Sequence, residues 1–348
     1  MAALRGILDY ACPANDIKAL EFVRDGYEWL RQNICPQLGQ GAHWESCCVG
    51  DLPAMAIQLT DAGMGDYWDD VEHATRNATA QAQVTDLEGI RRIGASYAER
   101  PKDARFGAPD DFRFTRNINI TDPIPNLECD DNVLERSIGA IANALTGGCY
   151  QTPNQMACCT ANGLQGFYYA WEAAIRHNGD TSTVNLLFTR FSEWMDLISF
   201  LPYEGKVVIH NKTSKNINVR IPQGVMPGNV SLAVNGNDIN NPSFCGRYLN
   251  ITGLSGREEI TVTFPQNKRK LTLIIPNMNG RMHWGFPKVS ANFVGSTCVG
   301  LGDERESIFG SENESILIKQ FNEPKYRSGQ TLFKDAPYYV PPKVIQWY

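Results

Sequence analysis

Residues 206–221 read KVVIHNKTSKNINVRI and mark the point where the sequence changes from a helical to an extended pattern. Apolar and polar side chains alternate here, as they do in half-buried strands. The stretches that predict strands in this way are 206–209, 217–221, 230–234, 259–264 and 270–275. Asn235-Gly236 adds a tight-turn signal. Several short strands at this spacing predict a β-sandwich domain over residues 201–348.

Residues 1–200 have a different period. Apolar residues recur there every three or four positions, which predicts amphipathic helices. Asp16, Asp51 and Thr160 are candidate N-terminal caps of three of these helices. The predicted helices cover about 16–30, 51–59, 67–71, 133–145 and 160–178. The chain is therefore expected to be an α+β multidomain protein, with a helical domain over 1–200 followed by β structure.

Composition excludes some classes of function. The formal net charge of −6 does not favour binding to a nucleic-acid backbone. No apolar stretch approaches the roughly 18–20 residues of a membrane span, so no membrane partner is expected. The oligomeric state and the cellular compartment are left open.

Three of the ten cysteines stand out because they precede predicted helices together with a second ligand-type residue. Glu45 and Cys47 come just before the helix that Asp51 is expected to cap, and Cys158-Cys159 come just before Thr160. A helix N-terminus favours the thiolate, the form that binds metals and attacks carbon. If the two helix starts face each other, these residues provide one carboxylate and three sulfurs, a plausible tetrahedral zinc set. The alternative is that the cysteines are buried and behave as small apolar residues.

The stretch Gly65-Asp66-Tyr67-Trp68-Asp69-Asp70-Val71 also allows two interpretations. Aromatic rings beside carboxylates are typical of sugar sites. The favoured interpretation is an acidic helix start, stabilised by the helix dipole, with Trp68 in the core.

Taken in order, these segments resemble the β-L-arabinofuranosidase-like glycoside hydrolases, family 127 and its relatives. The resemblance covers roughly residues 17–265. The segments that carry it are Glu45-Ser46-Cys47, Gly65–Val71, Arg76-Asn77, Cys158-Cys159-Thr160-Ala161-Asn162-Gly163, Val184–Leu187, Leu201–Gly205, Val219–Pro222, Val234–Gly236 and Gly246-Arg247-Tyr248.

The resemblance implies a helical (α/α) toroid followed by β-sandwich domains, and a zinc cofactor held by Glu45, Cys47, Cys158 and Cys159. It implies that Cys158 is the nucleophile of a retaining glycosidase acting on β-L-arabinofuranosyl or similar glycosides, so that the partner is a carbohydrate substrate. The thiolate would form a thioglycosyl intermediate, which water then hydrolyses.

Two features depart from the family pattern. The family places its general acid on a loop upstream of the Glu-x-Cys pair, but residues 35–44 contain no acid. Glu28 is the nearest upstream candidate, and it falls inside a predicted helix. The chain also shows fewer helices than a full toroid, so we expect an N-terminally truncated relative with the C-terminal half of the toroid. The alternative is a non-catalytic carbohydrate-binding or degenerate relative that lacks the acid/base.

Overall fold

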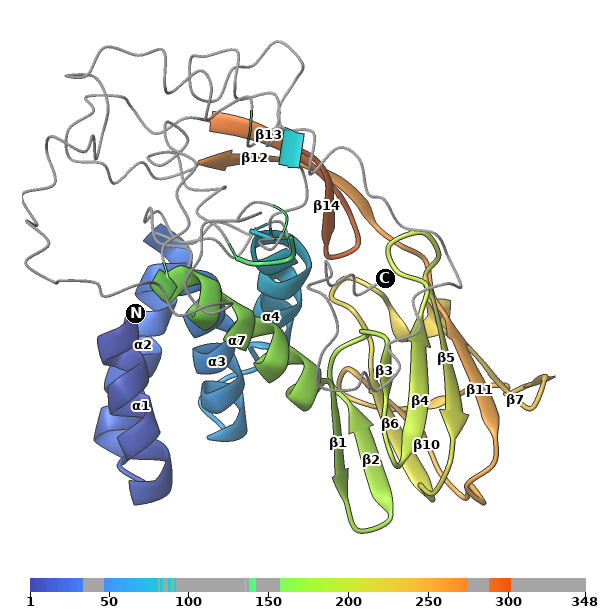
Figure 1. Cartoon of the computed structure of the whole chain (residues 1–348). Helices are drawn as coiled ribbons and strands as arrows, with labels where there is room; N and C mark the ends of the chain where they lie inside the picture. The colour runs from blue at the N-terminus through green and yellow to red at the C-terminus, as the bar shows by residue number, and fades with distance from the viewer. Residues whose placement is uncertain are drawn as a thin grey trace, which may run out of the picture.

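The computed structural model contains both helices and β-sheets, which confirms the α+β class (Figure 1). It describes residues 1–33, 47–80, 82–83, 87–88, 91, 135, 138–141, 157–274 and 288–301. The helices are α1 (Ala2–Ala14), α2 (Ile17–Asn33), α3 (Cys48–Asp61), α4 (Trp68–Ala74), the π-helix η1 (Thr75–Thr79), α7 (Ala157–Ala174) and the short 3₁₀-helix η3 (Pro227–Asn229). The predicted helix over 133–145 falls largely outside the described residues, as does the predicted loop over 100–130.

The helices begin close to the predicted positions, with two corrections at their caps. Thr160 does not cap α7, because that helix begins earlier, at Ala157. Asp16 caps α2 as predicted, because its Oδ1 accepts a hydrogen bond of 3.1 Å from the Ala19 backbone N–H. Asp51 does not cap α3, because that helix begins earlier, at Cys48. Asp51 lies in the first turn and pairs with Arg5 Nη1 at 3.0 Å. Arg5 belongs to α1, a helix that the sequence analysis did not predict.

The prediction that the last helix continues to Asn178 is wrong. Helix α7 ends at Ala174, and the next residues, Ile175–Asn178, form strand β1. This strand turns back at Gly179, which has φ +59°, and pairs antiparallel with Thr181–Val184. The apolar residue Ile175 fits the helical pattern of the sequence. In the structure it pairs with Val184 of β2, so that strand pairing replaces the helix at this position.

Two sheets enclose one hydrophobic core downstream of α7 (Figure 1). The first sheet has the order β1-β2-β6-β10-β9 and the second β3-β4-β5-β11-β7-β8. Alternate residues of both sheets are buried in that core, including Val219 of β6 and Ile209 of β5. The strands are β1 (Ile175–Asn178), β2 (Thr181–Val184), β3 (Arg190–Phe191), β4 (Met195–Ser199), β5 (Lys206–Asn211), β6 (Asn216–Arg220), β7 (Ser231–Val234), β8 (Asn237–Asp238), β9 (Ser243–Cys245), β10 (Tyr248–Ile251) and β11 (Glu259–Thr263).

The strands predicted at 206–209, 217–221, 230–234 and 259–264 are confirmed as β5, β6, β7 and β11. The Asn235-Gly236 turn is confirmed as well, because both residues have positive φ and join β7 to β8. Strands β1–β4 precede residue 201, and the domain division at 200/201 stays a prediction.

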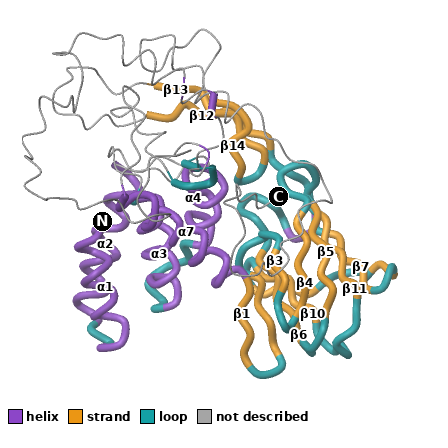
Figure 2. Tube along the Cα trace, viewed as in Figure 1, coloured by secondary structure: helices purple, strands orange, loops and turns teal. Residues whose placement is uncertain are grey.

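A third sheet packs against the helices rather than against the other two sheets (Figure 2). Its strands are β12 (Lys268–Ile274), β13 (Lys288–Val294) and β14 (Thr297–Leu301). Phe293 and Cys298 of this sheet share a core cluster with Val71 of α4. The predicted strand at 270–275 is confirmed as part of β12. No helix in the described part of the chain is long and apolar enough to cross a membrane.

Candidate metal and nucleophile site

Helices α3 and α7 approach so closely that only glycine fits at their contact. A Cβ added to Gly50 would lie 2.3 Å from the Asn162 carbonyl oxygen. A Cβ added to Gly166 would lie 2.8 Å from the Val49 carbonyl oxygen. These distances are shorter than a van der Waals contact, so the two glycines are what allows the backbones to meet. The contact brings the N-terminal turns of the two helices side by side.

Two of the predicted zinc ligands meet at this contact. Cys47 is the N-cap of α3 and Cys159 lies in the first turn of α7. Their Sγ atoms are 3.7 Å apart. Zinc–sulfur bonds of about 2.3 Å in tetrahedral geometry place two sulfurs about 3.8 Å apart. The observed separation fits the edge of a zinc tetrahedron and equally fits an S–H···S hydrogen bond between two thiols. It is much longer than the roughly 2.05 Å of a disulfide bond.

The other two predicted ligands are not described in the same detail. Glu45 lies outside the described residues, and of Cys158 only the backbone, in the first turn of α7, is described. Among the residues that are described, no group of three or more His, Cys, Asp or Glu side chains could hold a metal ion. The four-ligand set thus stays a prediction. Its two described members have a spacing that suits zinc.

The acidic stretch at the start of α4 forms ion pairs with the β-sheets. Arg220 at the end of β6 donates from Nη1 to Asp69 Oδ1 at 2.9 Å and from Nη2 to Asp66 Oδ1 at 3.0 Å. Arg247, before β10, donates from Nη2 to Asp69 Oδ1 at 2.9 Å. Despite its burial, Asp69 has a pKa well below its usual range, because both guanidinium groups stabilise its carboxylate.

Trp68 lies in the core, as the favoured interpretation predicted, and only 5% of it is exposed. The remaining acid, Asp70, accepts a hydrogen bond of 3.0 Å from the Tyr27 hydroxyl and pairs with Arg31 at 2.7 Å. Burial is the largest influence on the Asp70 carboxyl and raises its pKa. The acids of this stretch therefore join α4 to α2 and to the first β-sheet.

The Arg76-Asn77 pair, which contributed to the family resemblance, lies in η1 and connects three parts of the molecule. Arg76 is 1% exposed, forms an ion pair with Glu72 at 2.8 Å and donates to the Leu187 carbonyl at 2.7 Å. Asn77 donates to the Ser296 carbonyl at 2.9 Å and accepts from the Cys298 backbone N–H at 2.8 Å. On the opposite side of η1, the Thr79 hydroxyl donates to the Val49 carbonyl at 3.2 Å. The π-helix thus joins the α3–α7 contact to the third sheet.

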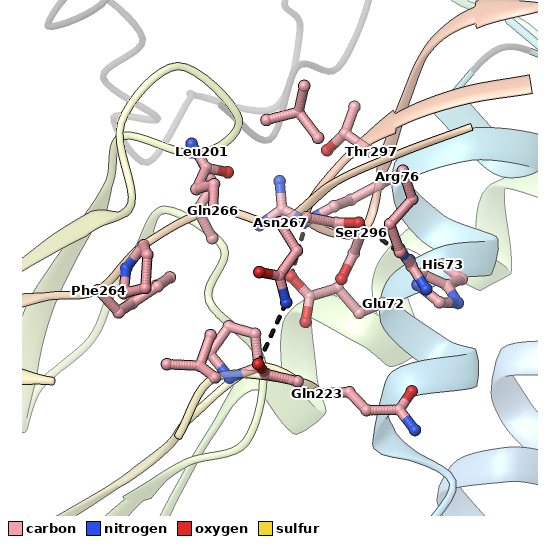
Figure 3. Close-up of a pocket in the computed structure, with 17 residues that line it drawn as sticks. Glu72, His73, Arg76, Leu201, Gln223, Phe264, Gln266, Asn267, Ser296 and Thr297 are labelled. Atoms are coloured by element: carbon pink, nitrogen blue, oxygen red, sulfur yellow. Dashed lines mark hydrogen bonds and ion pairs between the residues drawn. The ribbon is translucent and has the colours of Figure 1, made fainter. Parts of the chain in front are cut away.

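A cavity of about 380 Å³ is lined by residues of α4 and η1, among them Glu72, His73 and Arg76 (Figure 3). Its wall comes from α4 and η1, from the loops after β6 and β11, and from the β13–β14 turn. Nothing in the sequence pattern indicated this cavity, because its lining residues come from segments far apart in the chain. Arg220 and Arg247 were also missed as ion-pair partners. Both arginines stood in motifs that resembled the family. Their shared partner Asp69 is 151 positions from Arg220 and 178 from Arg247 in the sequence, too far for a local pattern to indicate the ion pairs.

Comparisons with known proteins give structural matches only. No family model matches the sequence, and no curated protein matches it. A GH127 β-L-arabinofuranosidase from Geobacillus stearothermophilus T6 matches with 13% identity and a TM-score of 0.49, over 85% of this chain and 45% of that chain. A GH127 β-arabinofuranosidase matches with 12% identity and a TM-score of 0.49, over 85% of this chain and 46% of that one.

A third solved structure, described as a glycoside hydrolase, has 13% identity and a TM-score of 0.40, over 73% of this chain and 37% of that chain. The chain thus spans less than half the length of each of these structures. The matches include two members of the family that the sequence resembles. All three likenesses are partial, with TM-scores below 0.5.

Proposed function

We propose that the chain carries the zinc-thiolate site of a retaining glycoside hydrolase acting on β-L-arabinofuranosyl or similar glycosides. The observation that carries the proposal is the 3.7 Å separation of the Cys47 and Cys159 sulfurs. These cysteines are 112 positions apart in the sequence, and each begins a helix. The motifs that resemble the family, in the same order along the chain, also support it. In fold, the proposal implies a toroid portion followed by a β-sandwich.

The residues that would hold the metal are Glu45, Cys47, Cys158 and Cys159. Their chemistry fits zinc, which accepts thiolate and carboxylate ligands in a tetrahedral arrangement. When bound, zinc would keep the thiols deprotonated at neutral pH. The N-terminal turns of α3 and α7 would favour the same thiolate form, since helix N-terminal N–H groups stabilise negative charge.

Cys158 is the proposed nucleophile. Its thiolate would attack the anomeric carbon, and the bond from that carbon to the leaving oxygen would break. Water would then displace the sulfur, so that two inversions give net retention. The departing oxygen of an alkyl glycoside needs a proton from an acid. Glu28 is poorly suited to supply it, since it lies within α2 and pairs with Arg31 at 2.9 Å.

A test with two substrates separates the nucleophile from the acid. p-Nitrophenyl β-L-arabinofuranoside has a leaving group stable enough to depart without protonation, whereas an arabinofuranosyl disaccharide does not. We expect the full chain to release p-nitrophenol, and the Cys158→Ala variant to lose at least about 100-fold in rate. The Cys245→Ala variant is the matched control, because Cys245 is an exposed thiol on β9.

Full activity in Cys158→Ala would contradict the proposed nucleophile. If the chain hydrolyses the aryl glycoside but not the disaccharide, the nucleophile works and the general acid is missing. The ion pair of Glu28 favours a second candidate function, a non-catalytic carbohydrate-binding relative. Binding of arabinose-containing oligosaccharides without turnover of either substrate would support that candidate.

A further inference from the structure

The cavity beside η1 has walls that are built before any ligand arrives (Figure 3). The Asn267 side chain donates from Nδ2 to the Gly224 backbone carbonyl at 3.1 Å. The Asn267 backbone carbonyl accepts a hydrogen bond of 2.9 Å from the Gly295 N–H. Gln266 donates from Nε2 to the Pro202 carbonyl at 2.6 Å. Gly224 and Gly295 both have positive φ, so each loop turns sharply at the mouth of the cavity. These bonds hold three loops in fixed positions around one space.

The charges around the cavity nearly cancel. Arg76 and Glu72 form a buried pair, with 1% and 3% of their side chains exposed. Burial lowers the pKa of His73, against the opposing effects of Glu72 and Asp69, so this ring is neutral at pH 7. Arg269, which lies at the rim, donates to the Gly295 carbonyl at 3.2 Å. The buried interior is therefore close to neutral, and the remaining positive charge, that of Arg269, lies at the rim.

Two buried polar atoms of the lining have no hydrogen-bond partner within the described part of the chain. One is the donor Arg76 Nη1 and the other is the acceptor Gln266 Oε1. Leaving such groups unsatisfied costs about 1–3 kcal/mol each, so native structures usually supply them with a partner. A hydroxyl group can both accept and donate. A molecule with several hydroxyls therefore offers both kinds of partner to the residues that line this cavity.

We propose that this cavity is a binding site for a neutral polyhydroxy ligand of monosaccharide size. Its volume falls within the range of small-ligand pockets, about 300–1,000 Å³. Gln223 at the mouth and Thr297 in the wall add polar groups, while Leu201 and Phe264 provide apolar surface for the C–H face of a sugar ring. The site is separate from Cys47 and Cys159, and the proposal does not depend on hydrolysis.

Saturation-transfer NMR with L-arabinose and the full chain tests the proposal. We expect saturable binding with a Kd on the order of 1–10 mM, as suits so small a ligand. Gln266→Met keeps the shape of the side chain but removes both polar atoms. Gln223→Ala removes an exposed amide at the mouth. Each variant is expected to weaken binding by about threefold to tenfold, the effect of one lost hydrogen bond.

Two controls locate the binding. Asn237→Ala changes an exposed amide on β8, away from the cavity, and should bind L-arabinose as the parent chain does. Cys158→Ala should also bind normally, even where it abolishes hydrolysis, so that failure of the proposed function and failure of this site can be told apart. The absence of saturable binding would overturn the proposal. Affinity unchanged from that of the parent chain in both Gln223→Ala and Gln266→Met would overturn it as well. So would a preference for the anion D-galacturonate over L-arabinose.

Discussion

At the scale of single residues, two glycines position the candidate metal site. Gly50 and Gly166 let the backbones of α3 and α7 approach within distances that no side chain permits. Cys47 and Cys159 meet only because this contact exists. A change at either glycine should therefore affect both stability and the separation of the two sulfurs, although neither glycine can bind a metal itself.

Gly166→Ala is expected to destabilise the chain by about 1–3 kcal/mol, because its Cβ would force α7 away from the Val49 carbonyl. Urea unfolding measures this change. Gly6→Ala is the matched control, since Gly6 lies in α1 with nothing within 4 Å of an added Cβ. That variant should gain about 0.5–1 kcal/mol, the usual preference for alanine within a helix. If both variants had the same stability, the close contact would not be what holds α3 against α7.

At the scale of elements, the start of α4 is joined to the first sheet by charge. Arg220 is 1% exposed and bonds both Asp66 and Asp69, while Arg247 reaches Asp69 from the turn before β10. A buried guanidinium that loses its carboxylate is left uncompensated, which costs far more than the loss of an exposed pair. This connection therefore matters for how the helices sit on the β-sheets.

Asp69→Asn is expected to lower the free energy of unfolding by about 3 kcal/mol at pH 7. Lys215→Ala is the control, because it breaks the exposed pair with Asp180 and should cost under about 1 kcal/mol. The effect of Asp69 depends on pH because its pKa is lowered in the folded state. Its stabilisation is complete above the unfolded pKa of about 3.9 and is lost as the pH falls further.

Urea unfolding at several pH values checks this expectation. The difference between the parent chain and Asp69→Asn should be constant from pH 7 to about pH 5 and narrow below about pH 4. A difference that grew on acidification would contradict the assignment of a stabilised carboxylate.

The sequence predicted the elements whose residues follow a clear local period. Strands β5, β6, β7 and β11 were found from alternation, and α2 from its apolar face and the Asp16 cap. Helix α7 was extended too far, since Ile175 fits a helical face as well as a strand, and only the pairing with Val184 decides between them. The partners of Asp69 and the cavity walls could not be predicted, because they depend on contacts between distant segments.

For the site, the sequence placed Cys47 and Cys159 at helix starts but could not show that they meet. The two cysteines meet because α3 and α7 cross closely, and Gly50 and Gly166 make that crossing possible. Two isolated glycines form no periodic pattern, so the crossing could not be predicted from the sequence. The positions of Glu45, Cys47, Cys158 and Cys159 at two predicted helix starts suggested the ligand set, with buried apolar cysteines as the alternative. The family resemblance favoured the metal ligands.

At the scale of the whole molecule, one chain of contacts connects the candidate site to the rest of the described structure. Helices α3 and α7 hold the two sulfurs, η1 packs against both helices, and Asn77 of η1 bonds the third sheet (Figure 1). The cavity lies where η1, the third sheet and the loops of the other two sheets meet. Residues of η1 thus contact both the α3–α7 crossing, through Thr79, and the cavity, through Arg76.

Zinc analysis of the purified full chain distinguishes a metal site from a pair of buried thiols. We expect about one zinc per chain, the number that one tetrahedral site holds. Cys159→Ser should lose most of this zinc, whereas Cys298→Ser should keep it. Cys298 is a suitable control because it is buried in β14, where burial raises its thiol pKa to about 12. A chain without zinc, or one whose zinc is unchanged in Cys159→Ser, would contradict the proposed metal site.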